Sequence, residues 1–458
     1  MTKIVKSNLA RIQTCDLENK TQIALDRGGI QTCDPVKIEE RTGYKHTKLG
    51  WIPQEWETPR IDEVFDFLST NSLSRSQLNY ETEDGVYNIH YGDIHTTYKQ
   101  PILDFDIENR VPKINRDIVL SQNIDFLKDG DLVIADASED YEGVGEAIEL
   151  KNINGKKVTS GLHTFAFRDK TYETAEGFRV YIFRNLLVKK ALKTIATGSK
   201  VYGISKGNIQ KFRIVLPPLP EQQKIAAILS TWDSAIAKQQ QLIAAKQEFK
   251  KGLMQLLLTG KKRFPEFEGN WETSKLGNYC QFTQGVQIPY SEQIDEEKKG
   301  YIRYLYIRDF FSNDFKCYVT DCYPSKIMEK EDLMMVNTGN TAGKVFKGTR
   351  GVLSNNAFKI STKKGLSKEF LYYLLSSEFT QLKIQRFFNY GGQPHVGHKN
   401  VARIPISIPN LAEQKKIIQI IDNFKKESRN MDESLNQLKN QKKGLMQLLL
   451  TGEKRVKI

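Results

Sequence analysis

The sequence contains no long apolar run. Nowhere in its 458 residues does an apolar stretch approach the length of about 18 residues that a membrane-spanning helix needs. The opening Met1-Thr2-Lys3 is not that of a signal peptide, so we expect a cytoplasmic protein without membrane contact. Cysteine is scarce as well. The five cysteines form no CxxC pair, which indicates neither a disulfide framework nor a zinc site.

Catalytic motifs are missing too. An adenine methyltransferase would need Pro-Pro between Asn or Asp and an aromatic residue, but the only Pro-Pro, at 217–218, lies between leucines. The Gly-Lys-Lys at 260–262 lacks the upstream glycine of a phosphate-binding loop. His395 and His398 form an HxxH pattern without an evident third ligand. We predict no catalytic residue, no metal and no cofactor bound by this chain.

Positive charge is in excess. The formal net charge is +13, which favours a polyanionic partner, although many basic soluble proteins bind none. Apolar residues make up 39% of the chain, enough for two or three domains with cores of their own. The 337–343 loop, Asn-Thr-Gly-Asn-Thr-Ala-Gly, could cradle a phosphate through its backbone amides or be a plain turn-rich loop.

The dominant feature is an internal repeat. Residues 251–260, Lys-Gly-Leu-Met-Gln-Leu-Leu-Leu-Thr-Gly, return letter for letter at 443–452, and the match extends without a gap over 217–263 and 409–455. Apolar residues in both copies are spaced alternately four and three apart, which is a heptad seam. Each copy predicts a helix of roughly 38 residues, about 57 Å long. The second start, Pro-Asn-Leu-Ala-Glu-Gln at 409–414, predicts a weaker cap.

Each predicted helix follows a β-rich segment. Strands are expected within 86–94, 131–135 and 164–167, and a helix over 175–192. Residues 264–408 echo this order and are too long for a hairpin loop, so a whole domain lies between the helices.

The predicted fold class is α+β. Two globular domains are separated by two long antiparallel coiled-coil helices, with a pseudo-twofold internal repeat. The expected divisions are an N-terminal extension without a core at 1–47, domains at 48–216 and 264–408, and helical segments at 217–263 and 409–458.

These motifs resemble one known family. The segment Leu-Pro-Pro-Leu-Pro-Glu-Gln-Gln-Lys-Ile at 216–225, the duplicated Lys-Gly-Leu-Met-Gln-Leu-Leu-Leu-Thr-Gly, and the opening Lys-Leu-Gly-Trp-Ile-Pro-Gln-Glu-Trp at 48–56 are similar to the specificity subunit of type I restriction-modification systems. The resemblance covers residues 47–458. Its motifs are specific because they occur twice in order.

The resemblance implies a non-catalytic subunit that binds double-stranded DNA. Each target recognition domain of the family reads one half of a split site, and the helices act as a spacer. Two methylation subunits dock on the assembly and use S-adenosylmethionine. Restriction subunits that use ATP and Mg join some complexes of this family, and the sequence leaves open whether they join this one.

Candidate DNA-binding residues are polar side chains of turn-rich segments, because Arg, Lys, Asn and Gln can make bidentate contacts with base edges. In the first domain they are Arg75, His90, Tyr91, His95, Tyr98, Lys99, Ser199, Lys200 and Tyr202. In the second they are Gln287, Tyr306, Arg308, Asn340, Lys344, Gln393, His395 and His398.

The helix ends carry more apolar residues than a two-stranded seam requires. This extra face predicts an extra partner, which we assign to the methylation subunits. The residues concerned are Leu253, Met254, Leu257, Leu445, Met446 and Leu449.

Two other interpretations stay open. One is a coiled-coil scaffold that joins two protein-binding domains, with incidental positive charge. The other is the specificity half of a related, fused restriction-methylation enzyme. Binding to random duplex at two salt concentrations separates the scaffold from the DNA reader, and activity of the pure chain would support the enzyme.

Overall fold

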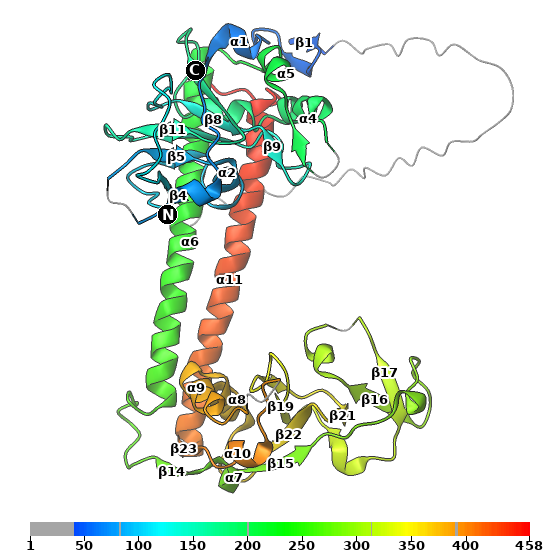
Figure 1. The fold of residues 1–458 in the computed structure, drawn as a ribbon. Coiled ribbons are helices and arrows are strands. Elements are labelled where there is room, and N and C mark those ends of the chain that lie inside the picture. The colour runs from blue at the N-terminus through cyan, green and yellow to red at the C-terminus, as the bar shows by residue number, and fades with distance from the viewer. Residues whose placement is uncertain (1–40, 82–83, 199–200, 313, 390–392) are drawn as a thin grey trace, which may run out of the picture.

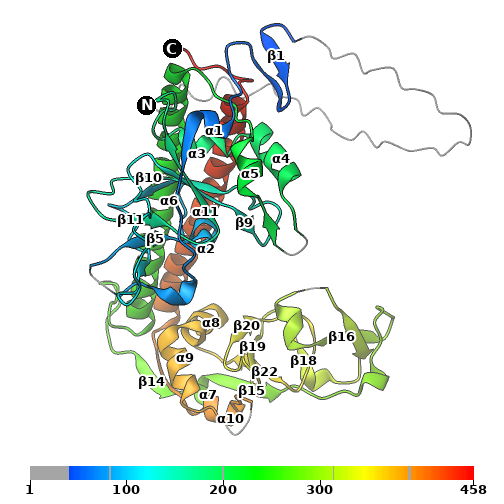
Figure 2. The same ribbon diagram turned by 45° about the horizontal axis from the view of Figure 1, so that its top comes forward.

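Two long helices form the axis of the molecule. The computed structural model describes residues 41–81, 84–198, 201–312, 314–389 and 393–458 (Figure 1). Helices α6 (Leu219–Leu258) and α11 (Leu411–Leu450) each span 40 residues, which is about 60 Å at the usual rise. They lie side by side with one domain at each end (Figures 1 and 2). The predicted fold class is thereby confirmed.

The two helices run in opposite directions. Lys246 of α6 forms an ion pair with Glu427 of α11. Asp233, which is earlier on α6, pairs at 2.5 Å with Lys442, which is later on α11. The antiparallel arrangement is therefore as predicted.

The seam between the helices is buried unevenly. On α6 the seam residues Ile225, Leu229, Ile236 and Ile243 are buried, whereas on α11 Ile417 and Ile421 are buried near the second domain. In the middle of α11 the seam residues are only half-buried, because a two-helix rod covers each apolar stripe from one side. These residues are Phe424, Met431, Leu435 and Leu438.

The second helix has the better cap. The side chain of Asn410 accepts a hydrogen bond from the backbone N–H of Glu413 at 2.9 Å, whereas Pro218 at the start of α6 offers no side-chain bond. The sequence-based expectation of a weaker second cap is wrong, because Asn is among the best capping residues. Both helices end before a glycine in the left-handed region, Gly260 (φ +70°) and Gly452 (φ +76°).

The first domain contains two main sheets. One has the order β3-β12-β8-β10-β6 and the other β11-β5-β7-β4. The strands are β3 (Phe65–Leu68), β4 (Leu78–Asn79), β5 (Tyr87–Ile89), β6 (Ile102–Asp104), β7 (Lys113–Ile114), β8 (Leu132–Ala135), β10 (Ala147–Lys151), β11 (Val158–Ser160) and β12 (Thr164–Asp169).

The second domain repeats this plan with the orders β15-β22-β19-β20 and β17-β16-β21-β18. Strand β12 is antiparallel to β3 and β8, as β22 is to β15 and β19, and β11 is parallel to β5, as β21 is to β16. The strands are β15 (Cys280–Gln284), β16 (Tyr301–Leu305), β17 (Cys317–Thr320), β18 (Ile327–Met328), β19 (Leu333–Val336), β20 (Val345–Lys347), β21 (Gly351–Leu353) and β22 (Ala357–Thr362).

Short helices and strands complete both domains. The first has β1 (Tyr44–Thr47), β2 (Gly50–Pro53), α1 (Ile61–Val64), η1 (Arg75–Gln77), α2 (Tyr91–Thr96), β9 (Ala137–Ser138), α3 (Arg179–Ile182), α4 (Leu186–Ile195), β13 (Tyr202–Gly203) and α5 (Lys206–Gln210). The second has β14 (Glu272–Lys275), α7 (Leu276–Tyr279), η2 (Tyr290–Glu292), η3 (Ile307–Phe310), η4 (Pro324–Lys326), α8 (Lys368–Ser376), α9 (Glu378–Gln385), α10 (His398–Val401) and β23 (Pro405–Ile408).

Local caps explain where the predicted elements differ. The strand expected over 86–94 stops after Ile89, because His90 caps helix α2. The helix expected over 175–192 is divided into α3 and α4, since Asn185 accepts the N–H of Leu187 at 2.9 Å and starts a new helix. Of the proposed extension 1–47, residues 1–40 lie outside the described residues, and Tyr44–Thr47 form β1, paired with β2.

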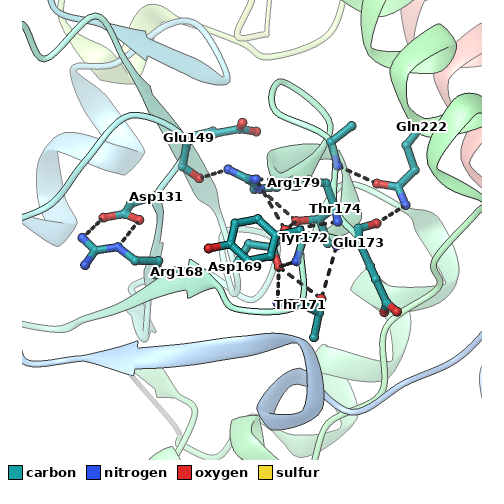
Figure 3. A network of polar contacts seen from close by, with 12 residues as sticks. Asp131, Glu149, Arg168, Asp169, Thr171, Tyr172, Glu173, Thr174, Arg179 and Gln222 are labelled. Atoms are coloured by element: carbon teal, nitrogen blue, oxygen red, sulfur yellow. Dashed lines mark hydrogen bonds and ion pairs between the residues drawn. The ribbon is translucent and has the colours of Figure 1, made fainter.

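The start of each helix is fixed to its own domain by one glutamine. The side chain of Gln222 accepts from Ala175 N (2.9 Å) and donates to Glu173 O (2.8 Å) (Figure 3). It also donates to Pro217 O at 2.8 Å. Gln414 makes the same three bonds in the second domain, to Ser367 N, Gly365 O and Pro409 O. Both glutamines are fully buried.

Candidate nucleic-acid interface

In each domain, polar side chains lie at the C-terminal end of one central strand. Strand β8 is followed by Asp136, and strand β19 by Asn337. A short bridge lies beside each position, where Gly203 pairs with Ala137 in the first domain and His395 pairs with Thr338 in the second. The repeat thus places different side chains on equivalent backbone positions.

In the second domain these side chains form a hydrogen-bonded amide cluster, which we define as Gln287, Asn337, Thr338, Asn355 and His395. Asn337 Nδ2 donates to Asn355 O at 3.3 Å, and Thr338 Oγ1 donates to Asn337 Oδ1 at 2.9 Å. Thr338 Oγ1 also lies 3.1 Å from His395 Nδ1. Asn355 Nδ2 donates to Gln287 Oε1 at 3.4 Å. Two predicted residues from distant segments, Gln287 and His395, therefore belong to one network.

Three more predicted residues lie on loops beside the amide cluster. The loop after β19 is tied to the segment before His395, because Gly339 N donates to Pro394 O at 2.9 Å. Asn340, Lys344 and Gln393 are exposed on these two loops. All three side chains are open to a ligand that approaches this edge of the domain.

Tyr306 and Arg308 form a second group. Tyr306 OH donates to Gln293 Oε1 at 2.9 Å, and burial raises the pKa of this phenol. The exposed guanidinium of Arg308 lies over the rings of Tyr306 (4.9 Å) and Phe315 (5.4 Å). Such stacking holds a guanidinium in a fixed plane, as a bidentate contact with a base or a phosphate requires.

His398 is set apart from these residues. Its ring faces Phe358 at 5.9 Å, and burial lowers the pKa of its imidazole. His395, in turn, is engaged by Thr338. In the part of the chain that the structure describes, no group of three or more His, Cys, Asp or Glu residues could hold a metal ion.

In the first domain the equivalent edge carries an aromatic cluster, which we define as His90, Tyr91, His95 and His163. The ring of Tyr91 lies 4.7 Å from that of His90, 5.3 Å from that of His163 and 6.4 Å from that of His95. His95 Nε2 lies 3.0 Å from Ala137 O. Two predicted residues, His90 and His95, thus lie around Tyr91, which is itself predicted.

His163 is a member of this cluster that the sequence prediction missed. It lies exposed between β11 and β12 with φ at +55°, and its Nδ1 is 3.2 Å from Asp136 Oδ1. Burial raises the pKa of the Asp136 carboxyl, and His163 opposes that shift. Aligning Phe165 with Phe358 would have paired His163 with Asn356 and Leu162 with Asn355, but neither turn carries a distinctive motif.

Other predicted residues of the first domain are buried in it or bonded to its buried side chains. His90 and Tyr98 are 7% and 8% exposed, and His90 Nδ1 caps α2 by accepting Gly92 N. Arg75 makes two bonds, at 2.7 and 2.6 Å, to the fully buried Asp93. His90 and Tyr98 therefore serve the core rather than direct base contact, which corrects the prediction for these two.

The remaining candidates of this domain lie at its surface. Lys99 is exposed, and its ammonium donates to Thr96 O at 2.5 Å. Tyr202 is half-buried against the ring of Tyr141 at 5.1 Å. Ser199 and Lys200 lie outside the described residues.

The apolar helix ends have partners within the chain. Leu257 and Leu449 are each 2% exposed. Leu257 lies in the core of the second domain and Leu449 in that of the first, with Leu253, Met254, Leu445 and Met446 packed against those cores. The assignment of Leu257 and Leu449 to an outside partner is therefore corrected, whereas the other four side chains are only half-buried and their contact with a partner stays a prediction. Among the described residues, no helix is long and apolar enough to cross a membrane.

The structure is that of a protein with two similar domains, one at each end of a pair of antiparallel helices. The family model for the type I restriction modification DNA specificity domain matches residues 53–246 and 268–440. The chain therefore belongs to this family.

Individual proteins of known family are also similar to this chain. The chain is 26% identical over 441 residues to the type I restriction enzyme MjaVIII specificity subunit of Methanocaldococcus jannaschii, covering 89% of this chain and 94% of that protein. Its fold is similar to a chain from a solved structure on complex assembly and conformational transition of the type I R-M system (TM-score 0.60, 16% identity, 88% and 99% covered). It is also similar to the HsdS subunit of Thermoanaerobacter tengcongensis (TM-score 0.50, 17% identity, 87% and 96% covered).

Proposed function

We propose that this specificity subunit reads a bipartite DNA site, with one domain on each half. The observation that carries the proposal is the pair of equivalent edges with unlike chemistry. The first presents His163 and Asp136, and the second presents the amide cluster, on the same backbone frame. A shared frame with different polar side chains suits two domains that recognise different base sequences.

The helices would set the distance between the half-sites. At about 60 Å the pair is longer than one turn of B-DNA, about 34 Å. Both domains can then contact one duplex and leave the base pairs between them unread. The net charge of +13 would contribute contacts with phosphates, which add affinity without sequence information.

Catalysis would belong to partner subunits. We infer that the chain itself is non-catalytic and that two methylation subunits dock on the helical spacer and carry S-adenosylmethionine. ATP and Mg would be bound by restriction subunits in a complex that includes them. Since Leu257 and Leu449 are covered by the chain's own domains, these two side chains would not belong to the docking surface.

The decisive experiment is co-expression with the neighbouring methylation subunit, followed by genome-wide mapping of methylated adenines. A single split motif with a fixed gap is expected. Methylation by the pure chain would instead support the fused-enzyme interpretation. Binding to random duplex that is insensitive to salt between about 50 and 200 mM would favour the protein scaffold.

A further inference from the structure

The turn between β21 and β22 is held rigidly at the surface of the second domain. The backbone carbonyl of Asn355 accepts from Gln284 Nε2 at 2.6 Å and from Asn337 Nδ2 at 3.3 Å. The next carbonyl, that of Asn356, accepts from Asn337 N at 3.0 Å. The turn is thus fixed by side chain and backbone from two other segments.

The same turn is also fixed by the close approach of the backbone at Gly285 to the backbone at Ser354. A Cβ atom on Gly285 would lie 1.9 Å from Ser354 O, so only glycine lets the end of β15 pass this near. Directly after this crossing, Val286 bridges Ser354 and the chain presents Gln287. The close contact of Gly285 and Val286 with Ser354 therefore sets the positions of both Gln287 and Asn355.

The side chains of these two residues project from this rigid base. Both residues are exposed, and Asn355 Nδ2 donates to Gln287 Oε1 at 3.4 Å, near the long end of the hydrogen-bond range. The bond aligns two amides side by side but is weak enough to be exchanged for a ligand. Groups held in position before binding lose little entropy on contact, which suits them to recognition.

We propose that Asn355 and Gln287 together read an adenine in the half-site of the second domain. An amide can donate to N7 and accept from N6 of adenine in the major groove, a pattern that no other base presents there. The equivalent turn of the first domain carries Leu162 and His163 instead, so that domain would read its half-site by different chemistry. This inference rests on the proposed function, and it assigns Asn355 and Gln287 to the reading of the second half-site.

The test uses the full chain co-expressed with its methylation subunit. Wild type, Asn355→Ala, Gln287→Ala and the matched control Asn356→Ala are compared by mapping methylated adenines. Asn356 is an exposed amide of the same turn, so its variant controls for a general disturbance of the turn. The first half-site and the gap serve as internal controls for folding and assembly.

We expect Asn355→Ala and Gln287→Ala to relax the motif at one A·T pair of the second half-site, with the first half-site unchanged. Discrimination against other pairs at that position should fall about ten- to hundredfold in competition binding. An unchanged motif in both variants, relaxation at a G·C pair, or the same relaxation in Asn356→Ala would overturn the inference. Absence of any split motif with wild type would overturn the proposed function itself.

Discussion

The guanidinium of Arg455 is paired with the carboxylate of Glu221, although one follows the second long helix and the other begins the first. Arg263 and Glu413 form the mirror pair at the other end, at 3.0 and 2.8 Å. Both glutamates are 1% exposed, so each carboxylate depends on an arginine from the far end of the other repeat. The two halves of the chain are thereby joined at both ends of the rod.

Removing Gln222 should loosen the first of these ends. Gln222→Ala leaves one buried N–H and two carbonyls without their partner, and we expect a loss of about 2–4 kcal/mol in the free energy of unfolding. Urea denaturation of the purified chain measures it. The neighbouring Gln223 is exposed, so Gln223→Ala should stay within about 0.5 kcal/mol of wild type. Equal effects of the two variants would contradict the assigned role.

Leu449 should behave as a core residue of the first domain. Leu449→Ala removes a side chain that is 2% exposed, and a destabilisation of about 2–5 kcal/mol is expected in the chain without any partner. Leu448 is 40% exposed, and its alanine variant is the matched control with a small effect. If Leu449→Ala left the free chain as stable as wild type but abolished assembly, the original assignment to a partner would be restored.

Stability should depend on the protonation of Glu149. Burial raises the pKa of this 2% exposed carboxyl from 4.5 to about 7, against the hydrogen bonds it accepts from Gly177 N and Val180 N. Because the folded-state pKa lies above the unfolded one, the stabilisation is complete below pH 4.5 and is lost as the pH rises through 7.

The expected loss is up to about 3 kcal/mol, and Glu149→Gln should remove this dependence. The free energy of unfolding of both proteins is measured by denaturation at pH 5 and at pH 8. The contributions of the other titrating groups cancel when the change in wild type is compared with the change in Glu149→Gln. Parallel pH profiles for the two proteins would show that the pKa of Glu149 is close to its ordinary value.

His163 should influence only the first half-site. Its ring is fixed by Asp136 and Tyr91, so His163→Ala should relax or weaken recognition there while the second half-site is kept. Mapping of methylated adenines in the co-expressed complex shows the result. His46 lies against Trp51, outside the aromatic cluster, and His46→Ala is the control that should keep the wild-type motif.

The length of the helices should determine the gap between the half-sites. Inserting seven residues at the middle of both α6 and α11 adds about 10 Å and close to two helical turns, which corresponds to about three base pairs of B-DNA. The mapped motif should keep both half-sites with a longer gap. An insertion in α6 alone breaks the register of the seam and should prevent assembly. An unchanged gap in the double insertion would contradict the spacer role.

The sequence alone determined the long helices and the repeated domains, whereas the antiparallel pairing was an inference that heptads do not fix and that the structure confirmed. Heptad spacing and turn-forming residues act over a few neighbours, so they can be recognised without the fold, and the exact repeat of 251–260 extended them across the chain. The family followed from the same motifs. Short caps such as His90 and Asn185, which divide two predicted elements, were missed because a single side chain decided them.

Only the tertiary structure decided which residues share a surface. Gln287 and Asn355, or Asp136 and His163, come from separate segments and meet because strands far apart in the chain pair in one sheet. The same holds for Leu257 and Leu449, whose apolar side chains face domains rather than a partner. Burial depends on what packs against a side chain from elsewhere in the chain, and local periodicity does not carry that information.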